Sequence, residues 1–173
     1  MRRLADSERI RRFLRELGRA ADAEASCYLT GGATAVLIGW RESTIDVDVR
    51  LVPEADALLR AIQRLKDELE INVELASPAD FIPVPAGWQE RSTFVAREGR
   101  LSVYHFDLVA QALAKVERAH AQDLGDVRAM LERGLVGREE ALAYYERIAP
   151  QLHRFPAVDP RSFRARVEEA FAR

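Results

Sequence analysis

Hydrophobic and polar residues follow two rhythms along this chain. Apolar positions three or four residues apart predict amphipathic helices, whereas alternation at every second residue predicts strands with one buried face. In the first part of the chain, the rhythms predict a helix, a strand, a short helix, a strand, a helix, a strand and a hairpin. We expect these elements at Asp6–Ala25, Cys27–Leu29, Ala33–Ile38, Thr44–Leu51, Ala55–Leu69, Ile71–Leu75, and Ser92–Ala96 with Leu101–Phe106.

The helical rhythm dominates after Phe106. Four helices are predicted, at Asp107–His120, Asp123–Arg133, Arg138–Pro150 and Pro160–Arg173. Asp107, Asp123 and Asp159 stand at the positions of N-caps, where a carboxylate accepts from free backbone N–H groups. We therefore expect an α/β core over residues 1–106 and a helical C-terminal part over residues 107–173 that packs on it.

The segment Ser77–Trp88, between the last strand of the core and the hairpin, follows neither rhythm. Its three prolines and one glycine predict an irregular loop. Phe81 and Ile82 make it too apolar for a disordered segment. The loop either packs over a sheet edge or forms a lip on a nucleotide pocket, where Trp88 would stack on a base.

The strand Thr44–Leu51 separates apolar from polar residues by strict alternation. Its two faces are Ile45, Val47, Val49 and Leu51, and Thr44, Asp46, Asp48 and Arg50. Two neighbouring carboxylates repel each other, and each raises the proton affinity of the other. Paired hard oxygen ligands suit Mg²⁺, which takes one or two carboxylates and completes its shell with substrate phosphates. Asp46 and Asp48 are therefore a candidate metal site; the alternative is a surface strand with two solvated aspartates.

A glycine pair precedes this strand. Gly31-Gly32 ends the strand Cys27–Leu29 and opens the short helix Ala33–Ile38. Backbone N–H groups at such a turn form a cradle for phosphate. One short segment thus combines a predicted phosphate cradle with a predicted metal anchor.

The choice of cations adds a further candidate. The chain has 26 basic residues, and only two of them, Lys66 and Lys115, are lysines. Lys115 shares a face of the helix Asp107–His120 with Gln111 and Arg118. A compact ammonium, in a chain that otherwise uses arginine, suits a point-charge contact to a phosphate.

The first of these motifs resembles the nucleotidyltransferase fold of the DNA polymerase beta superfamily. Its signature is a strand, Gly-Gly or Gly-Ser opening a helix, and a strand carrying Asp-x-Asp; Gly31-Gly32 and Asp46-Val47-Asp48 match it. The resemblance implies an α/β (α+β) fold, with a small mixed sheet flanked by helices. It also implies a third carboxylate on a later strand, for which Glu74 is the candidate, with an exposed strand glutamate as the alternative. Thr44 and Arg50 are further candidates for binding the nucleotide.

The helices after Phe106 resemble the tail motif of one bacterial group within that superfamily. The group includes AbiEii-type toxins and nucleotidyltransferase domains of unknown function (DUF6036-like). Its members carry Lys-x-x-Arg followed by Asp-x-x-Asp at a helix start, and Lys115, Arg118, Asp123 and Asp126 match this motif. The resemblance implies that Lys115 and Asp123 join the aspartate pair around the nucleotide, with Arg118 as a further nucleotide-binding residue.

The predicted function is metal-dependent transfer of a nucleoside monophosphate from a nucleoside triphosphate to a hydroxyl acceptor. Mg²⁺ or Mn²⁺ would be held by Asp46, Asp48 and Glu74, and RNA, a protein or a small molecule are all open as acceptors. Two alternatives remain. One is a catalytically silent nucleotide-binding or regulatory domain, and the other is a component of a toxin–antitoxin pair with an antitoxin or regulatory protein as its partner.

The amino-acid composition does not distinguish between these three functions, but it excludes some other classes of protein. With 48% hydrophobic residues, 31% charged residues and a net charge of −2, the chain has the composition of an ordinary globular protein and no overall attraction to nucleic acid. No apolar run approaches the about 20 residues that a membrane span needs. Cys27 is the single cysteine, which excludes an internal disulfide and favours a cytoplasmic setting. The histidines lack the spacing of metal ligands, so no zinc site is expected.

Overall fold

The computed structural model describes residues 2–172 and contains two compact units. The first, which we call the α/β unit, comprises the described residues up to Ser77 together with Ser92–Phe106. The second, the helical unit, comprises Pro78–Arg91 and the described residues from Asp107 onward. One division of the chain falls after Phe106, and the loop Pro78–Arg91 groups with the helices.

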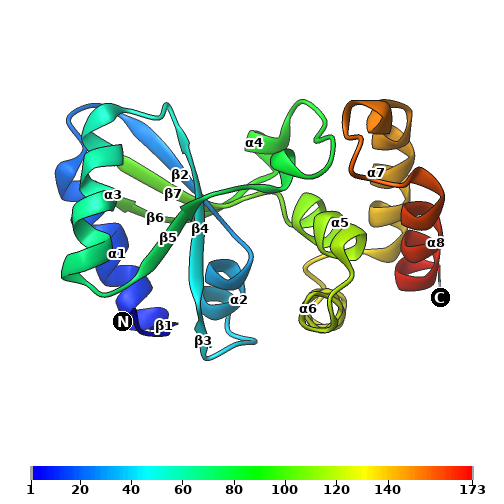
Figure 1. The fold of residues 1–173 in the computed structure, drawn as a ribbon, viewed down its shortest axis with the longest axis horizontal. Helices are drawn as coiled ribbons and strands as arrows, with labels where there is room; N and C mark the ends of the chain where they lie inside the picture. Colours follow the sequence, from blue (N-terminus) through cyan, green and yellow to red (C-terminus); the bar gives the residue numbers. More distant parts are fainter. Residues whose placement is uncertain (1, 173) are drawn as a thin grey trace. The chain divides into compact units, whose positions relative to one another are not determined.

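A five-stranded sheet forms the centre of the α/β unit (Figure 1). Its strands are β2 (Ala25–Thr30), β4 (Asp46–Val52), β5 (Asn72–Leu75), β6 (Thr93–Glu98) and β7 (Leu101–His105). They lie in the order β5-β4-β2-β7-β6, which leaves β5 and β6 at the edges. The pairs β4–β5 and β2–β7 are parallel, whereas β2–β4 and β6–β7 are antiparallel. The predicted small mixed sheet is therefore confirmed.

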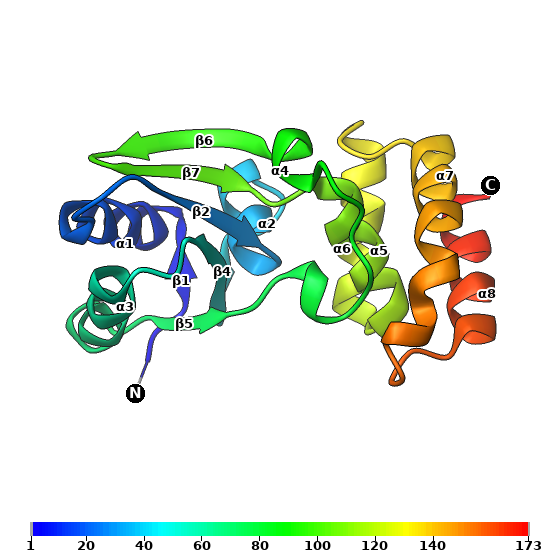
Figure 2. The same cartoon turned by 90° about the horizontal axis from the view of Figure 1, so that it is seen from above.

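Two helices, α1 (Ser7–Ala20) and α3 (Asp56–Glu68), lie side by side along one face of this sheet (Figure 2). Their apolar stripes and the inward residues of the strands form one hydrophobic core. The helix α1 is capped by Asp6, which accepts from the backbone N–H of Arg9, and it ends five residues before the predicted Ala25, where β2 begins. The short helix α2 (Gly32–Ile38) starts at the glycine pair, as predicted.

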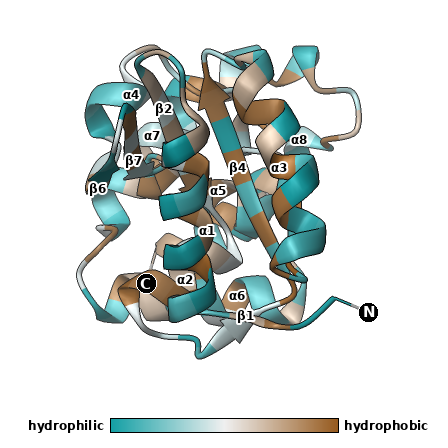
Figure 3. Ribbon diagram, turned by 90° about the vertical axis from the view of Figure 1, so that its left-hand side faces the viewer, coloured by the Kyte–Doolittle hydropathy of each residue, from teal (hydrophilic) through white to brown (hydrophobic). Residues whose placement is uncertain are grey.

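A separate two-stranded ladder corrects the predicted strand Thr44–Leu51. Its strands, β1 (Ala5–Asp6) and β3 (Ser43–Thr44), pair antiparallel, and β4 begins only at Asp46. Ile45 lies between β3 and β4, and its side chain is 69% exposed. Its predicted place on the buried face of the strand is therefore wrong. From Asp46 onward, β4 alternates between half-buried and buried residues, visible as alternating bands in Figure 3.

The helical unit is built mainly from four helices. They are α5 (Leu108–Arg118), α6 (Ala121–Glu132), α7 (Arg138–Ile148) and α8 (Pro160–Phe171). Asp107 caps α5 and Asp159 caps α8 as predicted, but the predicted cap at Asp123 is wrong, since α6 begins after His120 and holds Asp123 in its first turn. Shorter helical segments are η1 (Pro78–Asp80), α4 (Trp88–Arg91) and η2 (Ala149–Arg154). Within residues 2–172, no helix is both long and apolar enough for a membrane span.

The loop Pro78–Arg91 is held within the helical unit by the buried carboxylate of Asp107. Arg91 Nε donates to Asp107 Oδ2 at 2.8 Å, and the Tyr144 hydroxyl donates to the same oxygen at 3.0 Å. The terminal nitrogens of Arg91 donate to the backbone carbonyls of Pro85 and Ala86. One arginine therefore ties the loop to the start of α5, which explains in physical terms why the loop groups with the helices.

Candidate functional site

Asp46 and Asp48 lie two residues apart on the polar face of β4, and both are half-buried. In the parallel register with β5, Asp46 is opposite Asn72 and Asp48 is opposite Glu74. Residues opposite each other in a sheet share a face, so Glu74 stands beside Asp48 on the same side as the aspartates. Glu74 itself is exposed.

Asn72 is a site residue that sequence reasoning missed. Its Nδ2 donates to Oδ1 of Asp46 and lies 3.5 Å from Oε1 of Glu74. The amide therefore stands between two of the candidate acids and fixes the orientation of the Asp46 carboxylate. The only signal in the sequence was its place two residues before Glu74, on the same face of the strand.

The acid pair fits a divalent cation by the chemistry of its donors. Among residues 2–172, no three Cys, His, Asp or Glu side chains form a group that could hold a metal ion. Mg²⁺ needs only one or two protein carboxylates when substrate phosphates complete its shell, so two aspartates are a sufficient set. The metal prediction therefore depends on Asp46 and Asp48, and a metal-binding role for Glu74 stays a prediction.

The glycine turn lies directly beside this pair. Gly31 has φ +61° and ψ −129°, a conformation that residues with a side chain rarely adopt. A Cβ at Gly31 would stand 3.2 Å from Oδ2 of Asp48. Because α2 has only seven residues, its dipole adds little, and the glycine contributes mainly a backbone without a side chain next to a carboxylate.

Gly32 and Thr44 have a packing relationship of their own. A Cβ at Gly32 would lie 2.6 Å from Cβ of Thr44, closer than two carbon atoms can approach. Thr44 is buried, and its hydroxyl donates to the backbone carbonyl of Asp46 at 3.0 Å. Both residues thus shape the turn that leads into β4, while their role toward a nucleotide stays a prediction.

The tail motif forms one charge cluster within the helical unit, in which Arg118 is exposed and the other three residues are buried. Lys115 Nζ lies 2.7 Å from Oδ2 of Asp126 and 3.5 Å from Oδ1 of Asp123. Arg118 donates to both carboxylate oxygens of Asp123, at 2.8 and 2.7 Å. Burial alone raises the pKa of Asp123, but Arg118 and Lys115 outweigh it and hold the pKa below its ordinary value. The structure brings the four motif residues together, with two cations facing two anions.

One family model matches the sequence of this chain. The family is described as a nucleotidyltransferase of unknown function (DUF6036), and the match covers residues 7–138. The chain belongs to this family. The match confirms the resemblance seen in the sequence and spans the glycine turn, the acid pair, Glu74 and the tail motif. Searches of curated proteins and of solved structures find no match.

Membership of this nucleotidyltransferase family implies a nucleoside triphosphate as substrate. The structure places most of the predicted nucleotide contacts, Gly31, Gly32, Thr44 and Arg50, on or beside the turn and strand that carry the acid pair. Lys115, Arg118 and Asp123 belong to the helical unit. The assignment of these residues to a nucleotide stays a prediction.

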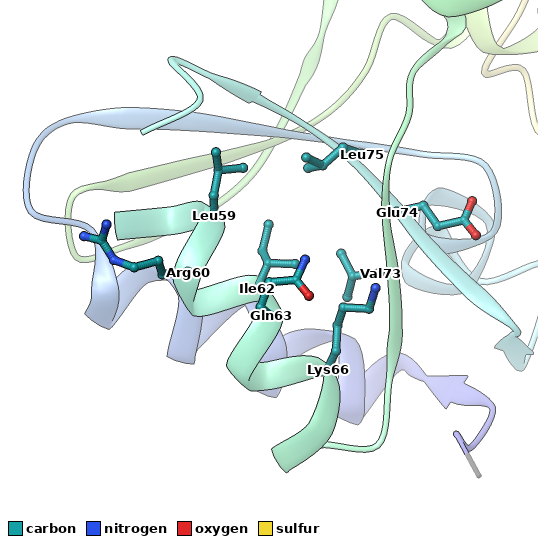
Figure 4. A pocket seen from close by; sticks show the side chains of 8 residues that line it. All are labelled: Leu59, Arg60, Ile62, Gln63, Lys66, Val73, Glu74 and Leu75. Atoms are coloured by element: carbon teal, nitrogen blue, oxygen red, sulfur yellow. The ribbon is translucent and has the colours of Figure 1, made fainter. Parts of the chain in front are cut away.

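A groove of about 620 Å³ lies elsewhere in the α/β unit, along the edge strand β5 (Figure 4). The helix α3 lines it with Leu59, Ile62 and Lys66, and β5 lines it with Val73, Glu74 and Leu75. Figure 4 shows the Glu74 side chain pointing away from the other labelled residues. Neither aspartate lines this groove, so it is separate from the acid pair.

The single cysteine takes no part in the site. Cys27 is fully buried in β2, and burial raises the pKa of its thiol to about 12. Since the thiolate is the reactive form, the thiol is inert in the folded protein.

Proposed function

We propose that this protein transfers a nucleoside monophosphate from a nucleoside triphosphate to a hydroxyl acceptor, with Asp46 and Asp48 as the metal-binding residues. The observation that carries the proposal is the position of these two half-buried carboxylates, on one strand face and directly beside the turn at Gly31. Family membership supports the reaction class.

The bond changes follow from this class of reaction. The acceptor hydroxyl oxygen forms a bond to the α-phosphorus, the bond to the pyrophosphate oxygen breaks, and pyrophosphate leaves. Glu74 stands beside Asp48 and is exposed, so its carboxylate accepts the hydroxyl proton in this proposal. Mg²⁺ or Mn²⁺, bound by the aspartates, would neutralise charge on the triphosphate.

The remaining residues position these groups. Asn72 holds the Asp46 carboxylate in one orientation through its side-chain amide. The missing side chain at Gly31 leaves room for the Asp48 carboxylate, whose Oδ2 lies 3.2 Å from where a Cβ would stand. The phosphate contact that we predict for Lys115 would add a positive charge, and it is tested separately below.

A thermal-shift experiment tests the metal assignment. Mg²⁺ or Mn²⁺ together with a nucleoside triphosphate should raise the melting temperature of the wild type, because ligands that bind only the folded state stabilise it. The variant Asp46→Asn/Asp48→Asn should lose this shift and remain folded. A matched control, Asp67→Asn/Glu68→Gln, removes two exposed acids of α3 and should keep the shift. An equal shift in both double variants would contradict the assignment.

A transfer assay separates an enzyme from a silent nucleotide-binding domain. The silent alternative differs in its use of Glu74, because a domain that only binds a nucleotide needs no carboxylate to accept a hydroxyl proton. Labelled nucleoside triphosphate is incubated with cellular RNA or protein, and label should enter the acceptor with the wild type but not with Asp48→Asn or Glu74→Gln. Binding without transfer to any acceptor would favour the silent domain. Transfer that survives Glu74→Gln would show that another group accepts the proton.

A further inference from the structure

The groove along β5 combines apolar residues with two cations. Its apolar lining is Leu59, Ile62, Val73 and Leu75, and its polar lining is Arg60, Gln63, Lys66 and Glu74. Figure 4 shows Val73 and Leu75 turned toward α3, with Glu74 on the other side of the strand. Leu75 is 48% exposed, which alone would need no partner, since single exposed apolar residues are common on protein surfaces. Here the exposed side chain lies in a groove beside an open strand edge.

The outer edge of β5 carries main-chain groups that no strand pairs. β5 is the last strand of the sheet and has β4 on one side only. The backbone N–H of Ala76 donates to the carbonyl of Val49 in β4 at 3.1 Å. Since the main-chain groups of successive residues point to opposite sides of a strand, those of Leu75 and Val73 point away from β4. Val73 is almost fully covered, so Leu75 marks the open part of the edge. Such an edge is a template for another extended chain.

The residues just before β5 are already contacted by the start of the chain. The backbone N–H of Arg3 donates to the carbonyl of Glu70 at 2.8 Å. Arg2 donates through Nη1 to the carbonyl of Ile71 at 3.2 Å. Among residues 2–172, no such contact continues along the outer side of Val73–Leu75. This part of the edge is therefore free for a second chain.

The two cations of the groove, Arg60 and Lys66, have no carboxylate partner. Within the described part of the chain, neither side chain forms an ion pair or a hydrogen bond. They are six residues apart on α3, which corresponds to about 9 Å along a helix. Among the described residues that line the groove, Glu74 is the only acid, and it points away from both cations (Figure 4). The groove therefore has a surplus of positive charge.

The neighbouring acids of α3 do not neutralise this charge. Asp67 pairs with Arg2, and Glu68 pairs with Arg64. Asp56, in the first turn of the helix, does not line the groove. A carboxylate from another molecule would therefore meet unpaired cations here.

We propose that this groove binds an extended acidic peptide segment of another protein, which adds as a strand to the edge of β5. Strand addition to an open sheet edge gives main-chain bonds, and the groove beside it selects alternate side chains. The groove favours an apolar residue beside Leu75 and an acid on either side of it, for Arg60 and Lys66. Because alternate residues of a strand share a face, the expected pattern is acid-x-apolar-x-acid, with the acids about 13 Å apart. Long arginine and lysine side chains can span the difference from 9 Å.

The fluorescence anisotropy of a labelled peptide, Glu-Thr-Leu-Thr-Glu with both ends blocked, tests the recognition. The wild type should bind this peptide and should not bind the matched peptide Lys-Thr-Leu-Thr-Lys. Arg60→Gln/Lys66→Gln should weaken binding of the acidic peptide about tenfold at low salt, and added salt should reduce the difference. Arg64→Gln removes a cation of the same helix that does not line the groove and should keep the affinity.

Two N-methylated versions of the acidic peptide test the strand pairing. Methyl groups on the glutamate and leucine nitrogens block the N–H groups on one side of the extended peptide. Methyl groups on the threonine nitrogens block those on the other side. Only one version should lose binding, because only one side of an added strand faces β5. Equal losses, or no loss in either version, would reject the addition of a strand.

Three further outcomes would overturn the proposal. No binding of the acidic peptide, or equal binding of the acidic and basic peptides, would show that β5 is a protected edge without such a partner. Equal effects of Arg60→Gln/Lys66→Gln and Arg64→Gln would reject the recognition of charge. A self-associated wild type that Leu75→Glu converts to a monomer would assign the groove to a second copy of this chain.

Discussion

Lys115 and Asp126 form a buried ion pair, with Nζ 2.7 Å from Oδ2 and both side chains almost completely covered. The sequence singles out Lys115 as a compact charge suited to phosphate, and the structure gives that charge two carboxylate partners within its own unit. Because a buried ammonium without a counter-ion is costly, the aspartates are needed for the lysine to be there at all. A phosphate would therefore have to compete with carboxylates that already neutralise the lysine.

Lys115→Met should destabilise the helical unit by about 3–5 kcal/mol, the usual cost when one member of a buried pair is removed. Asp126→Leu alone should cost a similar amount, because it leaves the ammonium short of a partner. The double variant Lys115→Met/Asp126→Leu should recover much of the loss, since it removes both charges together. Urea unfolding of the four proteins gives the coupling energy as a double-mutant cycle. Purely additive losses would show that the pair is not energetically coupled.

The same double variant tests the predicted phosphate contact of Lys115 in a folded background. If the lysine binds the triphosphate, Lys115→Met/Asp126→Leu should bind nucleotide more weakly than the wild type in a calorimetric titration. Lys66→Met removes the other lysine, which lines the groove along β5, and should leave the affinity unchanged. Equal affinities in all three proteins would restrict Lys115 to a structural role.

Gly32→Ala should destabilise the α/β unit by about 1–3 kcal/mol, as expected when an atom is forced into a packed site. The added Cβ would meet Cβ of Thr44 at 2.6 Å, and this part of a threonine cannot turn aside. The measurement is the free energy of unfolding. The matched control, Gly125→Ala, lies inside α6 with its nearest neighbour, a terminal Arg128 nitrogen, at 3.8 Å, and should be neutral or slightly stabilising. A neutral Gly32→Ala would mean that the turn can open.

Local patterns were sufficient to predict most of the helices and strands, because an element that is buried on one face has apolar residues at regular intervals in the sequence. The period failed at Ile45, which continues the alternation but lies between two strands with different partners, Ala5–Asp6 and the main sheet. Pairing with a distant segment is a tertiary event, and alternation alone cannot show where one ladder ends and another begins. The end of α1 was missed because the residues between Ala20 and Ala25 are alanine, aspartate and glutamate, and no glycine or proline marks the end of the helix.

Some residues of the candidate site could be predicted from local patterns in the sequence, and others could not. Asp46, Asp48 and Glu74 could be placed on one face because strand–helix–strand connections favour parallel neighbours, and the register bears this out. The contact of Asn72 with Asp46 depends on side chains from two strands meeting in space, which spacing in the sequence does not reveal. Asp123 looked like a helix cap because carboxylates favour that position, but its ion pairs with Arg118 and Lys115 are tertiary contacts.

Arg91→Gln should loosen the loop Pro78–Arg91 without unfolding the helical unit. The substitution removes the positive charge that pairs with the Asp107 carboxylate. It also removes the guanidinium donors to the backbone carbonyls of Pro85 and Ala86. Amide hydrogen exchange should therefore speed up across the loop, while the interiors of α5 and α7 keep their protection. Arg97→Gln removes an exposed pair with Glu24 and should change neither exchange nor stability measurably. Unchanged exchange in the Arg91→Gln loop would show that apolar packing alone holds it.

His105 should make the α/β unit less stable as the pH falls from 7 to 5. The ring is buried on β7 with Nδ1 3.0 Å from the Thr34 hydroxyl, and burial, together with the charge of Arg11, lowers its pKa to about 4. In the unfolded chain the pKa of the histidine is near its ordinary value of 6.5. Between pH 6.5 and pH 4 the unfolded chain therefore binds a proton that the folded chain does not, and this favours unfolding. Stability from this residue is complete above pH 6.5 and is lost toward pH 4, with a decrease of about 2 kcal/mol between pH 7 and 5.

Urea unfolding at several pH values in this range measures the effect, and His105→Asn isolates it. An asparagine amide can donate to Thr34 where Nδ1 of the histidine stood, yet it does not titrate, so the variant should lose the pH slope while keeping the hydrogen bond. His120→Asn changes an exposed histidine of the helical unit and should retain the wild-type slope. A slope that persists in His105→Asn would assign the pH dependence to another group. A wild type without any slope would mean that the folded protein accepts the proton on His105 at no cost, which its burial against Thr34 and the charge of Arg11 argue against.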